Sequence, residues 1–275
     1  MTVTPLQGIT YTCFGLSYIL ALGFEIARVR WPRAGLRSLG LILGAVGLLT
    51  HTAYLALHHP SPAAPYGSLL LLAWVLAVFY FYGTIHHARQ AWAVFVLPVV
   101  IGLVGLSLLL ITGDNANDIH VPPWSFGDTL WGAIHGFLLL FAGVGLSVAF
   151  LASVMYLVQA RRLRDKLNPL GGIKILSLER LEAMNRRSVN LAFPLLTVGL
   201  ILGGILLKRE YDTIENWWSL KVLGTVGLWS VSALLLYMRY AANVAGRRLA
   251  VLSILAFALL VAVLATAHPF AEVAK

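Results

Sequence analysis

The stretch 92–112, WAVFVLPVVIGLVGLSLLLIT, decides the fold class, because it is long and apolar enough to cross a lipid bilayer. It contains no charged residue, and a helix of about 20 apolar residues spans the hydrocarbon core. Comparable runs lie on both sides of it, near 8–27, 37–57, 67–84, 129–158, 189–207, 217–238 and 249–267. The sequence therefore predicts a polytopic membrane protein of about eight spans.

The spans are expected to be α-helices. Their apolar runs are continuous and lack the strict alternation that a membrane barrel needs, and a helix satisfies its own backbone polar groups within lipid. Only 11% of the 275 residues are charged and 59% are hydrophobic, whereas soluble domains carry about 25% charged residues. We predict an all-α helical bundle forming a single membrane domain over 1–275.

Positive charges are distributed unevenly among the connections between these spans. The first, third, fifth and seventh connections hold most of the 20 Lys and Arg residues, whereas the others hold most of the acidic residues. Lys and Arg gather in cytoplasmic loops, so we expect both termini outside in a multi-pass protein of the bacterial cytoplasmic membrane. The net charge of +9 follows this topology. A basic net charge is also typical of nucleic-acid-binding proteins, but here the basic residues lie beside the membrane spans. We therefore expect contact with the lipid bilayer and no nucleic-acid binding.

The long fifth connection ends in a segment with helical periodicity, near 174–187. Leu178, Leu181 and Met184 are three residues apart, Ser177 is a suitable N-cap, and Glu179 stands in the first turn. This pattern predicts a short amphipathic helix on the cytoplasmic face of the membrane.

Two histidines are placed near the outer ends of different spans. His135 lies early in the span 129–158, and His268 follows the last span. Imidazoles at one depth on two helices suit axial ligation of the iron of a planar macrocycle from both sides. The alternative is that each is an interfacial residue reaching towards water. His51, inside the second span, is expected to support a ligand or to hydrogen-bond a neighbouring helix.

Three tryptophans gather near the acidic outer connection at 210–221. Trp217 and Trp218 are adjacent, and Trp229 follows about three helical turns later. Tryptophans at membrane boundaries are often anchors. These three are also placed to line a platform for an aromatic ligand.

Several motifs extend over nearly the whole chain: Ala64-Pro65-Tyr66-Gly67, Trp131-Gly132-Ala133-Ile134-His135, Leu178-Glu179-Arg180-Leu181-Glu182, Asn185-Arg186-Arg187 and Phe193-Pro194-Leu195-Leu196. In order and spacing they resemble the cytochrome c assembly proteins. That family includes the haem-delivery subunit of system II cytochrome c maturation and the HemX-type membrane proteins.

The resemblance implies a set of haem contacts. In that family a tryptophan-rich outer segment lies between two external histidines that ligate haem; His135 matches the first and His268 resembles the second. The family segment typically reads Trp-Ser-Trp-Asp-Pro-Lys-Glu. Trp218 matches its second tryptophan, Lys221 its lysine, and Trp229 a later tryptophan. The chain departs from the pattern at three positions that bear on synthase activity, namely Ser219, Leu220 and Val222.

The function that the resemblance implies is delivery of haem in cytochrome c maturation. Haem b is expected at the outer face between His135 and His268, shielded by the tryptophans and offered to an apocytochrome c or another assembly partner. The protein is expected to act at most as part of a cytochrome c synthase complex. The alternative is a non-catalytic partner of a haem-biosynthesis enzyme, or a structural subunit of a respiratory complex, acting through the basic cytoplasmic face 161–187.

Overall fold

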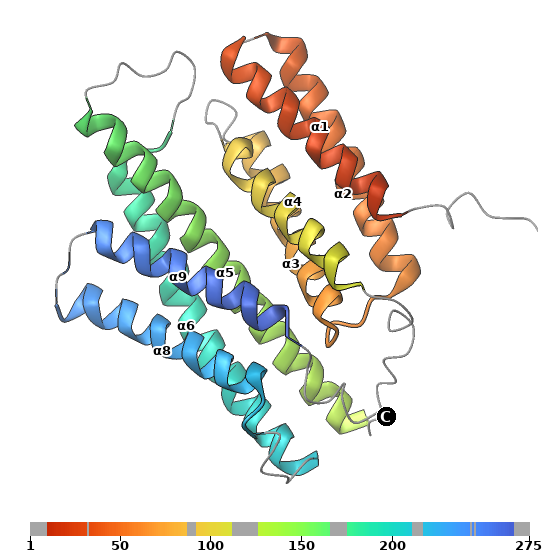
Figure 1. Ribbon diagram of the computed structural model, residues 1–275, viewed down its shortest axis with the longest axis vertical. Coiled ribbons are helices and arrows are strands. Elements are labelled where there is room, and N and C mark those ends of the chain that lie inside the picture. Colours follow the sequence, from red (N-terminus) through yellow and green to blue (C-terminus); the bar gives the residue numbers. More distant parts are fainter. Residues whose placement is uncertain are drawn as a thin grey trace, which may run out of the picture. The chain divides into compact units, whose positions relative to one another are not determined.

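The computed structural model describes residues 10–31, 33–86, 92–111, 126–165, 175–210, 217–242, 244 and 246–266. Within these ranges there are eight long α-helices and no strand (Figure 1). They are α1 (Tyr11–Arg30), α2 (Ala34–His58), α3 (Pro65–His86), α4 (Trp92–Leu110), α5 (Phe126–Arg164), α6 (Leu178–Glu210), α8 (Leu220–Tyr240) and α9 (Gly246–Leu264). All eight are long and apolar enough to cross a membrane, which confirms the predicted all-α fold of about eight spans.

Two helices extend well beyond the predicted apolar runs. α5 continues to Arg164, and α6 begins at Leu178, so that part of the amphipathic segment predicted near 174–187 forms the first turns of α6. Leu181, on the apolar face of those turns, is fully buried. The helix continues past 187 because Ser188, Val189 and Asn190 include neither proline nor glycine.

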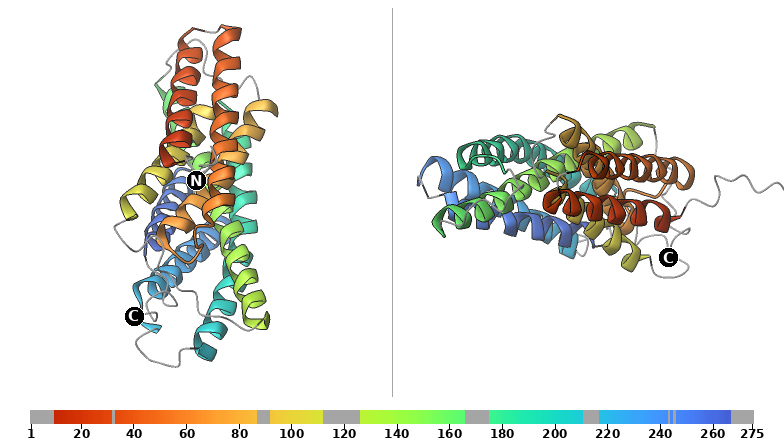
Figure 2. Two further views of the ribbon diagram at one scale, coloured as in Figure 1. Left: turned by 90° about the vertical axis from the view of Figure 1, so that its right-hand side faces the viewer. Right: turned by 90° about the horizontal axis from the view of Figure 1, so that it is seen from above.

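The described chain divides into two compact helical units, and the first consists essentially of α1 to α4. α1 and α2 lie side by side, as Figures 1 and 2 show, and α1 also packs on α4. The buried residues of α1 are Phe14, Tyr18, Ala21 and Glu25, whose spacing of three or four residues puts them on one face. Gly47 of α2 permits close approach, because a Cβ there would lie 2.7 Å from the Tyr18 ring.

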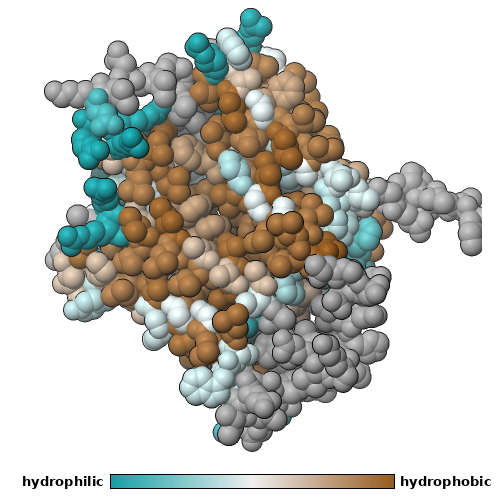
Figure 3. All heavy atoms as spheres, viewed as in Figure 1, coloured by the Kyte–Doolittle hydropathy of each residue, from teal (hydrophilic) through white to brown (hydrophobic). Residues whose placement is uncertain are grey.

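The second unit consists essentially of α5, α6, α8 and α9. α8 packs against both α9 and α6, and a buried apolar cluster joins Ala149, Val189 and Leu235 from α5, α6 and α8. Outside this core, large apolar side chains are exposed, as expected of helices that face lipid. Figure 3 shows hydrophobic residues over most of the face in view.

Candidate functional site

His135 is held by a close crossing of α5 and α6 in the second unit. Its Nδ1 lies 2.7 Å from the carbonyl oxygen of Gly199. One turn later on α6, a Cβ at Gly203 would lie only 2.5 Å from the Cε1 atom of His135. Gly199 and Gly203 form a Gly-x-x-x-Gly pair, a pattern that lets two membrane helices approach closely. The imidazole therefore packs directly on the backbone of α6.

The hydrogen bond to Gly199 defines the chemistry of the His135 ring. A carbonyl oxygen only accepts, so Nδ1 carries the proton and donates it, and the ring lone pair is on Nε2. Histidines that ligate metals are commonly oriented in this way, with the second ring N–H donated to a carbonyl or carboxylate. The geometry of His135 fits an axial ligand that binds iron through Nε2.

Trp217 and Trp218 precede α8 and are exposed to different degrees. The indole of Trp218 is 70% exposed and that of Trp217 is 39% exposed. The six-membered ring of Trp217 approaches α6, where a Cβ at Gly204 would lie 3.9 Å from it. An exposed indole is a flat apolar group of the kind that a macrocycle stacks on.

Trp229 is placed differently from the other two tryptophans. Its Nε1 donates to the hydroxyl of Thr197 on α6 at 2.9 Å, and its ring stacks on Phe193 with centroids 5.7 Å apart. The side chain therefore joins α8 to α6. Its part in a haem platform stays a prediction.

Lys221 connects the beginning of α8 to the end of α9. Its Nζ donates to the carbonyl oxygen of Thr266 at 3.1 Å, and its ammonium lies within electrostatic range of the His135 ring. His135, Lys221 and Thr266 thus belong to one end of the second unit. His268, two residues beyond Thr266, lies outside the described residues.

His51 belongs to the first unit and is completely buried there. Its ring stacks on Phe14 with centroids 4.3 Å apart, and Nδ1 lies 3.4 Å from the hydroxyl of Tyr18. Among the described residues, its Nε2 has no hydrogen-bond partner. His51 contacts a neighbouring helix, and hydrogen bonding to such a helix is one of the two roles expected of it. The other role, support of a ligand, stays a prediction.

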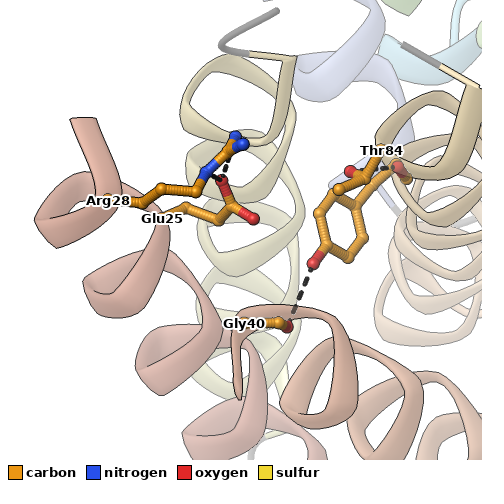
Figure 4. A network of polar contacts seen from close by, with 5 residues as sticks. Glu25, Arg28, Gly40 and Thr84 are labelled. Carbon is orange, nitrogen blue, oxygen red and sulfur yellow. Dashed lines mark hydrogen bonds and ion pairs between the residues drawn. The ribbon is translucent and has the colours of Figure 1, made fainter. Parts of the chain in front are cut away.

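A buried ion pair in the first unit was missed by sequence reasoning (Figure 4). Glu25 is completely buried and accepts from the guanidinium of Arg28 at 2.6 and 2.9 Å. A Cβ at Gly40 of α2 would lie 3.2 Å from the second carboxylate oxygen, and the Gly40 carbonyl accepts from the hydroxyl of Tyr80 at 3.5 Å. The available signal was an acidic residue inside an apolar run, because such residues are costly in lipid and need partners.

The side chains at the His135 end suit haem better than a bare metal ion. Within the part of the chain that the structure describes, no group of three or more His, Cys, Asp or Glu side chains is placed to hold a metal. Haem iron already has four porphyrin nitrogens and needs only axial ligands from the protein. One oriented imidazole, two exposed indoles and a nearby ammonium fit that requirement.

Comparison with known proteins identifies the family of the chain. The family model described as cytochrome C assembly protein matches residues 63–265. A protein of Trieres chinensis named cytochrome c biogenesis protein CcsA is 24% identical over 219 residues, which cover 70% of this chain and 69% of the relative. A protein of the same name from Gloeobacter violaceus is 25% identical over 278 aligned positions, covering 78% and 77%. No solved structure matches the chain. Because the family model covers well over half of the sequence, the chain belongs to the cytochrome c assembly protein family.

Proposed function

We propose that this protein binds haem b at the outer face of the bacterial cytoplasmic membrane and delivers it during cytochrome c maturation. The observation that carries the proposal is the hydrogen bond between His135 Nδ1 and the Gly199 carbonyl, which orients the imidazole as an axial ligand. The relatives named cytochrome c biogenesis proteins support the process.

The second axial ligand in this proposal is His268. The Lys221–Thr266 hydrogen bond places the end of α9 at the same end of the unit as His135. His268 follows Thr266 by two residues in the sequence.

Trp217, Trp218 and Lys221 complete the proposed site. The indoles of Trp217 and Trp218 cover the macrocycle, and the ammonium of Lys221 attracts its carboxylates. Haem contributes its vinyl groups to the thioether bonds, and the apocytochrome contributes the cysteines. The protein supplies binding, orientation and exclusion of water, without a nucleophile of its own.

Absorption spectra of the detergent-purified protein test this proposal. Two imidazole ligands impose a strong field, so the wild-type protein should give a low-spin, six-coordinate spectrum in both oxidation states. His135→Ala and His268→Ala should each give a high-spin spectrum or lose haem, and added imidazole should partly restore the low-spin form.

His86→Ala is a matched control. The Nδ1 of His86 also contacts a backbone carbonyl, that of Tyr82 at 3.0 Å, but within its own helix in the first unit. This variant should keep the wild-type spectrum. A wild-type spectrum in His135→Ala contradicts the proposal.

A second candidate function is favoured by the beginning of α8. Ser219 stands where the family has an acidic residue, and its hydroxyl accepts from the Val222 N–H at 3.4 Å as the helix N-cap. A serine here stabilises the helix without offering a carboxylate to a haem substrate. This favours a non-catalytic membrane partner of a haem-biosynthesis enzyme, or a structural subunit of a respiratory complex.

Ser219→Asp separates the two candidates, because aspartate is an equally good N-cap. If the variant gains cytochrome maturation in a strain without its own assembly protein, the result supports haem delivery. The wild-type site would then lack only this carboxylate. A variant that binds haem as before and gives no maturation supports the non-catalytic partner.

A further inference from the structure

A small cavity lies away from the His135 end of the second unit, between α5, the end of α8 and the first turns of α6 and α9. It is lined by residues that include Ser153, Tyr156, Glu182, Asn185, Arg239 and Gly246. Its volume of about 10 Å³ is the room for one water molecule or for one oxygen atom of a larger group. By the predicted topology, this end of the unit faces the cytoplasm.

Asn185 fixes one side of this cavity. It is 5% exposed, and its Nδ2 lies 3.0, 2.9 and 2.8 Å from the Ala149 carbonyl, the Ser153 hydroxyl and the Ser253 hydroxyl. Its Oδ1 accepts from Nη2 of Arg239. Both polar atoms of the amide are therefore hydrogen-bonded. Its oxygen holds the guanidinium in a fixed orientation beside the cavity.

The rest of the Arg239 guanidinium has no hydrogen-bond acceptor in the part of the chain that the structure describes. Its Nε and Nη1 are buried and have no hydrogen-bond partner among the described residues. A buried cationic donor without an acceptor is costly, more so than a neutral one. The side chain is therefore arranged for an acceptor that carries negative charge.

The net charge around the cavity is positive and attracts anions, and one carboxylate belongs to its lining. Six arginines of this unit lie on the described segments at this end, and two glutamates accompany them: Arg180, Arg186, Arg187, Arg239, Arg247 and Arg248, with Glu179 and Glu182. Glu182 itself lines the cavity and is exposed. Its carboxylate repels a second negative charge, which disfavours free phosphate dianion relative to a phosphodiester.

The surface beside Arg239 fits the headgroup region of a bilayer. Tyr237 and Tyr240 of the same turns of α8 are 63% and 58% exposed, and the hydroxyl of Tyr240 accepts from Asn190 Nδ2 at 2.6 Å. Exposed tyrosines at the end of a membrane helix mark the level of lipid headgroups. Basic pockets between membrane helices on the cytoplasmic side bind anionic headgroups.

We propose that Arg239, oriented by Asn185, binds the phosphate group of an anionic phospholipid at the predicted cytoplasmic end of the second unit. One phosphate oxygen occupies the cavity and accepts from the guanidinium. The acyl chains lie along the exposed apolar surface of α8 and α9, which includes Leu234, Val251 and Leu255.

Native mass spectrometry of the purified full-length protein tests the proposal, with phosphatidylglycerol, phosphatidylcholine and inorganic phosphate added separately. Wild type should retain phosphatidylglycerol at least tenfold more tightly than the other two. Arg239→Gln should weaken phosphatidylglycerol binding by about tenfold, since it removes a charge-assisted contact. Arg247→Gln, which removes one exposed charge at the same end, should weaken it only a few-fold.

Equal losses in Arg239→Gln and Arg247→Gln overturn the site, because they show general attraction by the basic surface. Equal affinity of wild type for inorganic phosphate overturns the lipid assignment. Arg239→Lys guards against a folding defect: it keeps the charge, cannot bind Asn185 and phosphate together, and should bind less tightly than wild type. Glu182→Gln should raise the affinity for inorganic phosphate, and an unchanged affinity contradicts the selectivity argument.

Discussion

Replacement of Gly203 by alanine tests how the second unit positions His135. A Cβ at this position would lie 2.5 Å from His135 Cε1, whereas non-bonded carbon atoms approach to about 3.5 Å. The ring has to move by about 1 Å, because the helix backbone is the less mobile partner. The 2.7 Å contact between His135 Nδ1 and the Gly199 oxygen then lengthens beyond hydrogen-bonding distance.

The expected result is a fall in haem affinity by about ten- to hundredfold, which is the usual cost of losing the partner that orients a metal-ligating histidine. Haem titration of purified apoprotein, followed by its absorption band, measures this. Gly204→Ala is the matched control, since its Cβ meets only the Trp217 ring at an ordinary 3.9 Å. Both substitutions change helix propensity equally. Equal haem affinity in the two variants would refute the role assigned to the Gly199 contact.

Two further predictions concern topology and the first unit. Reporter fusions after Gly113 and at the C-terminus should report outside, and one after Arg164 inside; the opposite pattern contradicts the positive-inside assignment. Glu25→Gln should destabilise the protein by about 3 kcal/mol in thermal or denaturant unfolding, because it removes the buried negative charge that faces the Arg28 guanidinium. The exposed pair of Arg161 and Asp165, 3.6 Å apart, provides the control: Asp165→Asn should cost under about 1 kcal/mol, and equal costs would refute the burial argument.

The helical fold was accessible from the sequence because a membrane span is a local property. The run 92–112 is apolar throughout, and α4 occupies 92–110 of it. The ends of the helices were harder to predict from the sequence, since charged residues such as those at Arg161–Arg164 continue a helix beyond the apolar run. Hydropathy marks the lipid boundary and not the end of the helix.

The candidate site was accessible only in part. His135 and Trp218 were selected as candidates by residue type and by motif, and the sequence contains Gly199-x-x-x-Gly203, a close-packing pattern. The hydrogen-bond acceptor of His135 could not be predicted from the sequence. Every residue carries a carbonyl oxygen, and only the crossing of α5 and α6 brings that of Gly199 to the ring. The roles of the Glu25 ion pair and of the Arg239 guanidinium likewise depend on burial against other helices, which the sequence does not show.

The most direct test of the central claim is the haem content of the protein purified after haem-replete expression. Measured as the pyridine haemochrome per polypeptide, wild type should carry about one haem per chain. The double variant His135→Ala, His268→Ala should carry essentially none while it elutes as a folded species. A well-folded wild-type protein without haem, or a double variant with the wild-type haem content, would contradict the account.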